Sequence, residues 1–129
     1  MAPRVEESRS RRFAAGLAEL YGELMGIVPD RVEIHLDGEI LTAILFGSSA
    51  PAEDSLFLRP EGCRILRDYH EACARELFQP TAALARRLLG RRLVNLVLES
   101  APPSRHKILV LVLAGDAAGE GPEGEGDPG

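Results

Sequence analysis

The sequence has no tryptophan and only 5% aromatic residues, so a hydrophobic core must be built from aliphatic side chains. It contains no apolar run near the roughly 20 residues that cross a bilayer, and its N-terminal MAPRVEESRSRR lacks the apolar stretch of a secretory signal. Cys63 and Cys73, the two cysteines, lie ten residues apart in a helical pattern, too far for a disulfide. These absences predict a cytoplasmic protein with two buried, reduced thiols.

Common enzyme motifs are also missing. The sequence has no G-x-S-x-G, P-loop, G-x-G-x-x-G or H-E-x-x-H segment. His35, His70 and His106 do not fall in a spacing typical of metal ligands. The neighbouring carboxylates Glu53 and Asp54 stand at an expected helix start, where they are better explained as partners of the helix dipole than as a catalytic acid pair. The sequence predicts a protein that is not an enzyme and holds no cofactor or metal.

The net charge of −5 comes from the C-terminal end of the chain. Residues 115–129, GDAAGEGPEGEGDPG, carry five acidic residues and no basic one, which leaves 15 acidic against 15 basic residues in the rest. This segment has too little apolar surface to order itself, so we expect a disordered acidic tail. Residues 1–9 are expected to form a flexible arm, and residues 10–114 a single neutral domain whose only lysine is Lys107.

The first part of the domain predicts one helix and a β-hairpin. Apolar residues at spacings of four and three in residues 13–24 indicate a helix that starts near Ser8 or Ser10 and ends at Gly26. Residues 31–46, RVEIHLDGEILTAILF, alternate apolar and polar side chains around an Asp-Gly pair, which is typical of a hairpin.

The second part predicts two helices and two strands. A short helix is expected over about 50–58, and one helical phase holds over 62–89, with a bend at Pro80. Two strands follow, at 93–100 and 107–114. The order α-β-β-α-α-β-β predicts an α+β fold: a four-stranded, mainly antiparallel sheet with helices on one face. The sheet is mixed if the long crossover places the second and third strands parallel.

Four arginines near the end of the long helix are a candidate anion or partner contact. Gly90 has the position of a left-handed helix stop, and Arg86 and Arg87 stand in the final turn, next to the negative end of the helix dipole. Arg91 and Arg92 follow directly. One of these two can join the helical pair around bicarbonate, phosphate or a partner carboxylate. Solvated or dipole-facing arginines are the simpler interpretation.

The element order α-β-β-α-α-β also occurs in KH-like RNA-binding domains. Those domains clamp nucleic acid with a G-x-x-G loop between two helices, whereas the corresponding segment here, LRPEG, begins with Leu58. A neutral domain and an acidic tail also disfavour polyanions. A KH-like nucleic-acid or small-anion binding module therefore stays as the alternative function.

The last strand predicts a homodimer. It contains six consecutive apolar residues, although a strand with one solvated face should alternate. Three helical segments cover only one face of a four-stranded sheet. In a monomer, one alternating set of this strand should therefore be exposed, together with neighbours such as Leu41 and Leu45. The two sets are Leu109, Leu111 and Leu113, and Ile108, Val110 and Val112. A second copy is the simplest cover, and the N-terminal arm or the bent half of the long helix is the competing one. The candidate dimer-interface residues are Ile108, Leu109, Val110, Leu111, Val112 and Leu113.

Three short segments carry a family resemblance. They are MGIVP with Gly26 and Pro29, SAPAE with Pro51, Ala52 and Glu53, and LLGRRLV with Gly90, Arg91 and Arg92. With the strand pattern around them, over roughly residues 10–114, the chain resembles the MpsC-like family, small bacterial proteins named for a sodium-translocating, membrane-potential-generating system linked to bicarbonate uptake. The resemblance implies an accessory protein that contacts a membrane transporter subunit at the periphery of the inner membrane, and it brings no catalytic residues.

Overall fold

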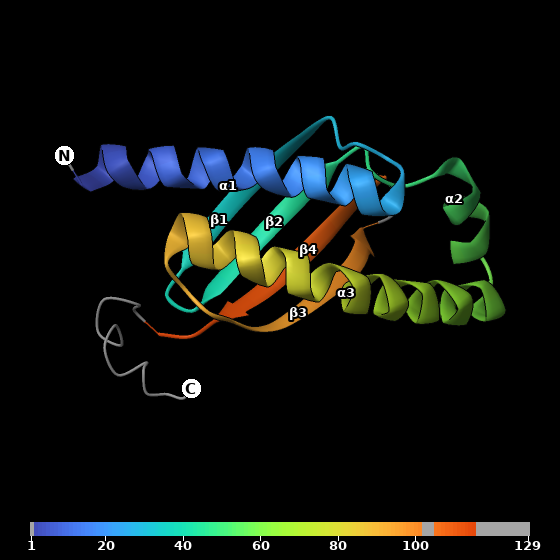
Figure 1. Ribbon diagram of the computed structural model, residues 1–129. Helices are drawn as coiled ribbons and strands as arrows, with labels where there is room; N and C mark the ends of the chain where they lie inside the picture. Colours follow the sequence, from blue (N-terminus) through green and yellow to red (C-terminus); the bar gives the residue numbers. More distant parts are fainter. Residues whose placement is uncertain (1, 102–104, 116–129) are drawn as a thin grey trace.

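A computed structural model describes residues 2–101 and 105–115, with backbone alone for 2–7 and Ala101. The expected acidic tail lies, apart from Gly115, outside these residues. The element order confirms the predicted α-β-β-α-α-β-β arrangement and the α+β fold (Figure 1). The elements are α1 (Ala2–Met25), β1 (Arg31–Asp37), β2 (Ile40–Phe46), α2 (Pro51–Phe57), α3 (Pro60–Leu89), β3 (Leu93–Ala101) and β4 (His106–Leu113).

The four strands form one antiparallel sheet in the order β1-β2-β4-β3. β4 lies between β2 and β3 and pairs antiparallel with both. β2 and β3 are therefore not neighbours, and the mixed sheet that a parallel crossover between them would have produced does not form. This order leaves β1 and β3 as the two edges of the sheet.

The predicted hairpin between β1 and β2 is confirmed. Asp37 pairs with Ile40, so the connecting loop consists of Gly38 and Glu39. Gly38 has a φ of 65°. A two-residue hairpin loop needs such a left-handed residue to match the twist of its strands, and glycine adopts this conformation without a steric cost.

Helix α1 begins at Ala2, well before the predicted start near Ser8 or Ser10. Pro3 suits the first turn of a helix, where its missing N–H would have no partner, and no residue after it interrupts the pattern. Residues 2–9 are therefore helical, and the flexibility expected of them stays a prediction.

Helix α3 runs as a single helix through Pro80 and ends at Gly90. Gly90 has a φ of 67°, and its N–H donates to the carbonyl oxygen of Arg86 at 3.1 Å. The predicted glycine stop is confirmed. At the other end of the sheet, the N-cap of α2 is Ala50, and the hydroxyl of the nearby Ser48 donates to the carbonyl oxygen of Leu45.

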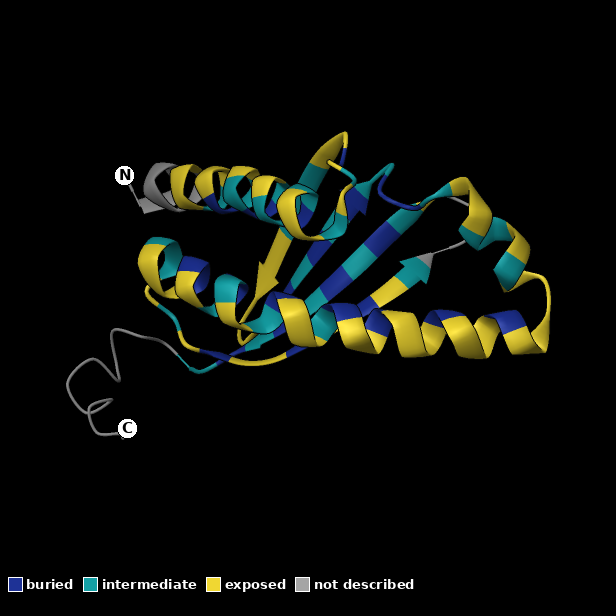
Figure 2. Cartoon of the chain, turned by 45° about the vertical axis from the view of Figure 1, so that its right-hand side comes forward, coloured by how far each residue is buried: buried dark blue, intermediate teal, exposed yellow. Residues whose placement is uncertain are grey.

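Helices α1 and α3 lie on the same face of the sheet (Figure 1), and the core fills the space between. Of the two thiols expected to be buried, Cys73 is in this core, whereas Cys63 is exposed near the start of α3. The core takes every second residue of β2 and β4 and one stripe of each long helix, as the dark segments of Figure 2 show. Its fully buried members are Phe13, Leu17, Leu41, Ala43, Leu45, Leu77, Ala85, Leu109, Leu111 and Leu113.

The other face of the sheet is covered by no helix of the described chain (Figure 1). Alternation along β4 leaves Ile108, Val110 and Val112 on this face, half-buried by neighbouring strands alone. On β2, the neighbours expected there were Leu41 and Leu45, but both are fully buried under the helices. Ile40 pairs with Val112 and Ile44 pairs with Ile108, and paired residues lie on the same face of a sheet. The β2 residues on the open face are therefore Ile40 and Ile44, and not Leu41 and Leu45.

Candidate functional site

A buried ionic network lies between the sheet and the start of α3. The only lysine of the chain, Lys107 on β4, is 1% exposed. Its ammonium donates to Glu53 Oε1 at 2.5 Å and to His70 Nε2 at 2.7 Å. The hydroxyl of Ser100 on β3 lies 3.1 Å from the same His70 nitrogen. The buried ammonium of Lys107 is thus paired with the Glu53 carboxylate and bonded to the His70 imidazole, which the Ser100 hydroxyl contacts in turn.

The network keeps His70 neutral. Because an ammonium only donates, Nε2 of His70 accepts the bond from Lys107, and the Ser100 hydroxyl donates to it as well. Burial, followed by the nearby positive charge of Lys107, lowers the pKa of His70 to about 4. The imidazole is therefore uncharged at neutral pH.

Helix α2 is positioned by the same network. The second carboxylate oxygen of Glu53 accepts the Ala50 N–H at 3.2 Å, and the Glu53 N–H donates to the Ala50 carbonyl at 3.0 Å. Asp54, the next residue, pairs at the surface with Arg105 at 3.4 Å. Neither carboxylate forms the acid pair that the sequence left open, since each has its own cationic partner.

Two tyrosines and a thiol pack around the network. The Lys107 ammonium lies 5.6 Å from the centre of the Tyr69 ring, which favours a cation through the ring's negative face. Burial raises the pKa of Tyr69 to about 12 and that of Tyr21 further still. Burial also raises the pKa of the Cys73 thiol. These groups stay protonated, so Lys107 and Glu53 carry the charges here.

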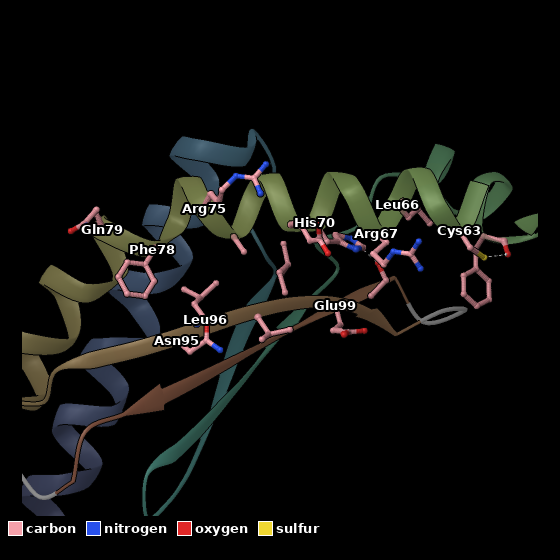
Figure 3. A pocket seen from close by; sticks show the side chains of 16 residues that line it. Cys63, Leu66, Arg67, His70, Arg75, Phe78, Gln79, Asn95, Leu96 and Glu99 are labelled. Carbon is pink, nitrogen blue, oxygen red and sulfur yellow. Dashed lines mark hydrogen bonds between the residues drawn. The ribbon is translucent and has the colours of Figure 1, made fainter. Parts of the chain in front are cut away.

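A groove opens from this network along the sheet edge, between α3 and β3 (Figure 3). It has a volume of about 860 Å³. Cys63 and Leu66 line one end, Phe78 and Gln79 line the other, and His70 lies between them. The strand below it is a free edge, so the groove adjoins backbone groups that have no neighbouring strand.

The groove is bordered by charges of both signs. Arg67, Glu71 and Arg75 stand on its α3 side, and Glu99 stands on its β3 side. No ion pair joins any of these four to another residue within the described ranges 2–101 and 105–115. The border thus carries two positive and two negative side chains, none of which is in an ion pair among the described residues.

The open sheet face is a second candidate surface. Its centre is apolar, and its flanks are mostly acidic. Glu33 and Asp37 lie on the β1 side and Glu99 on the β3 side, since each pairs across with a residue of this face. Arg31, which contacts Glu33 at 3.2 Å, is the one cation among them. The half-buried or exposed apolar residues of this face are Ile40, Ile44, Phe46, Val97, Ile108, Val110 and Val112.

Of the four arginines singled out from the sequence, Arg91 is held by backbone carbonyl groups of the fold. Arg91 donates from Nε to the Ala114 carbonyl at 3.0 Å and from Nη2 to the Gly38 carbonyl at 3.1 Å. It therefore ties the end of β4 to the β1–β2 hairpin. Arg86, Arg87 and Arg92 are exposed, and their side chains form no hydrogen bond to another described residue.

The structure places the six candidate dimer-interface residues in two groups. Leu109, Leu111 and Leu113 face the helices and are fully buried. Only Ile108, Val110 and Val112 reach the open face. An interface on this face has three of the six residues available to it.

Sequence reasoning did not find the Lys107 network. Lys107 and Glu53 are 54 residues apart in the sequence, and no local motif joins them. One signal was present. The only lysine among many arginines occupies the same strand phase as Leu109 and Leu111, which points a charge into the core.

In the part of the chain that the structure describes, no three histidine, cysteine or acidic residues gather in a way that holds a metal ion. Across the same residues, every helix is too short or too polar to span a bilayer.

Comparison with known proteins gives one match. The family model described as "Na+-translocating membrane potential-generating system (MpsC)" matches residues 6–115, which is most of the chain. No curated protein gives a significant match, and no solved structure does. The matched range includes the network, the groove and the open sheet face.

Proposed function

The chain belongs to the MpsC family, and from this premise we propose that it is a non-enzymatic accessory protein of a membrane-potential-generating, Na⁺-translocating system. It acts by binding another protein of that system. The observation that carries the proposal is the open sheet face, an apolar surface that no helix of the described chain covers.

The chemistry of this face supports a protein partner. Large exposed apolar patches with polar rims are typical of interaction sites. The centre of the face offers Ile44, Ile108 and Val110 to a partner, and burying such surface stabilises a complex by about 25 cal/mol per Å² before association costs. The acidic flanks favour a partner whose apolar patch is surrounded by basic residues.

A membrane subunit fits this description. Cytoplasmic loops of membrane proteins carry an excess of lysine and arginine. Three carboxylates against one guanidinium at the flanks of the face attract such loops, and they repel an anionic lipid surface. We therefore place the protein in the cytoplasm, peripheral to the inner membrane, held there by a transporter subunit and not by lipid.

The test is affinity capture from native membranes, with Val110→Glu as the disruptive variant. Val110 lies in the centre of the open face and is half-buried, so a carboxylate there faces the partner without entering the core. We expect the unchanged protein to capture an integral membrane protein and the variant to lose it.

The matched control is Ala83→Glu, which adds the same charge on the exposed side of α3. It should keep the captured membrane protein. Equal capture by both variants, or a complex with RNA in place of a membrane protein, would contradict the proposal. The RNA outcome would favour the KH-like alternative.

The protein is also proposed to be a homodimer. The support from the structure is that two separate surfaces of the described chain lack a cover, the open face and the free β3 edge. One copy can cover one of them while the transport partner takes the other.

A further inference from the structure

We propose that two copies of this chain join through their β3 edges, in antiparallel register, so that the two sheets become one of eight strands and the α3 helices pack against each other across the axis. The inference rests on the proposed dimeric state and assigns its interface. It leaves the open face of both copies to the transport partner.

β3 has the properties of an edge that pairs. It is the longest strand of the sheet, and its sequence LVNLVLESA has one charged residue, Glu99. Charged side chains are a common protection of edge strands. β1, the opposite edge, carries Arg31, Glu33 and Asp37 in a shorter strand. Of the two edges, β3 is therefore the less protected against another strand.

The backbone of β3 shows which groups face outward. The Leu96 N–H donates to the side-chain oxygen of its neighbour, Asn95 Oδ1, at 2.9 Å. This places the Leu96 amide on the side away from β4. Alternate residues of a strand direct their backbone groups to the same side, so Leu98 and Ser100 also face the edge. Backbone groups of these three alternate residues can then pair with a second strand.

The groove provides room for the second helix. α3 runs beside β3 in the opposite direction, with Phe78 above the Leu96 end and Arg67 above the Glu99 end (Figure 3). A two-fold axis near Leu98 therefore brings the middle of α3 to its own copy. Ala74 stands in that middle, and its small side chain lets two helices approach closely.

The charges of the groove complement those of a second copy. A two-fold interface pairs each residue with a different residue of the partner, so it favours a surface that carries both signs. Glu71 and Arg75, one helical turn apart at the proposed axis, have no ion pair within the described residues. In the dimer, Glu71 of each copy meets Arg75 of the other.

The open face lacks this balance of positive and negative charges. Its flanks hold Glu33 and Asp37 on one side and Glu99 on the other, with Arg31 as the only cation. Packing two such faces on each other brings acidic groups together. Charge therefore assigns the second copy to the β3 edge.

A charge-exchange experiment tests the proposal by light scattering on the full-length protein at about 100 μM. Arg75→Glu places carboxylates against carboxylates across the axis, and Glu71→Arg places guanidinium groups against guanidinium groups. We expect each variant alone to have the 14.0 kDa mass of one chain, and the unchanged protein twice that mass. An equimolar mixture of the two variants should restore the double mass, because opposite charges then face each other.

Two controls separate loss of the β3 interface from a general effect of the charge change. Arg87→Glu makes the same charge change on exposed α3 surface outside the groove, and it should stay dimeric. Amide exchange at Leu98 and Ser100 should be at least tenfold slower in the unchanged protein than in Arg75→Glu, because the dimer adds hydrogen bonds to both amides.

Three outcomes would overturn the inference. They are a monomeric unchanged protein, dimeric single variants, and a dimer that Val110→Glu dissociates, which would assign the second copy to the open face. A monomer that still captures a membrane protein through Val110 would remove the dimer and leave the proposed function in place.

Discussion

β4 has two faces of nearly the same composition and opposite environments. Leu109, Leu111 and Leu113 are fully buried under α1 and α3, whereas Ile108 and Val110 on the other face are covered by none of the described helices. The one polar residue that points to the helices, Lys107, is buried with its own counterion. An apolar pattern along a strand therefore shows which of its faces is buried only once the positions of the helices are known. On the covered face a side chain serves the fold, and on the open face it is available to a partner.

The largest expected effect is on the covered face, at Lys107. Lys107→Met leaves the Glu53 carboxylate in a mostly buried place without its cation. Removing one partner of a buried pair destabilises a protein by about 3–5 kcal/mol. Urea unfolding should show a loss of this order for the single variant. Glu53→Gln with Lys107→Met should lose less than the sum of the two single changes, and additive losses would show that the two groups are not coupled.

A matched pair of truncations compares the two faces directly. Leu111→Ala opens a cavity in the core and should cost about 3 kcal/mol of unfolding free energy. Val110→Ala removes half-buried methyl groups and should cost about 1 kcal/mol or less. Thermal or urea unfolding of monomeric protein measures both. Similar losses at the two positions would mean that the open face is covered in the folded chain.

A smaller effect is expected in the pH dependence of stability. His70 has a pKa of about 4 in the folded protein, below the ordinary value of 6.5 that it regains on unfolding. Below pH 6.5 the unfolded chain binds a proton that the folded protein does not. Stability from this group is therefore complete above pH 6.5 and falls as the pH drops toward about 4. Between pH 6.5 and 5 the loss should be about 2 kcal/mol.

Two histidine variants isolate this effect. His70→Gln should flatten the decline between pH 6.5 and 5 in urea unfolding. His35→Gln removes an imidazole on the exposed β1 side of the open face and should keep the original slope. In His35→Gln, Glu53, Lys107 and Ser100 still face His70. An unchanged slope in His70→Gln would show that His70 does not carry the decline.

Local patterns in the sequence were enough for most of the fold. The helices, the hairpin at Gly38 and the stop at Gly90 follow from spacing and from residues that adopt a left-handed backbone. The position of β4 between β2 and β3 could not be predicted, because it depends on contacts between distant strands. The start of α1 was placed too late, since polar residues such as Ser8 can continue a helix as well as begin one.

The candidate site was less accessible to sequence reasoning. The stretch Ile108 to Leu113 predicted a strand with two apolar faces. Because the side chains on the two faces are equally apolar, the sequence did not show which face the helices cover. The hydrogen bonds of Arg91 with the Gly38 and Ala114 carbonyls join three segments that only the folded chain brings together. The Lys107 network depends on the same kind of long-range contact.

The central claim is that the open sheet face binds a membrane protein, and crosslinking in intact cells tests it most directly. A photoreactive residue at position 110 lies in the centre of this face, and one at position 83 lies on exposed α3 surface. The account predicts a covalent adduct with an integral membrane protein from position 110 and none from position 83. An absence of any membrane-protein adduct from position 110, or equal adducts from both positions, would contradict it.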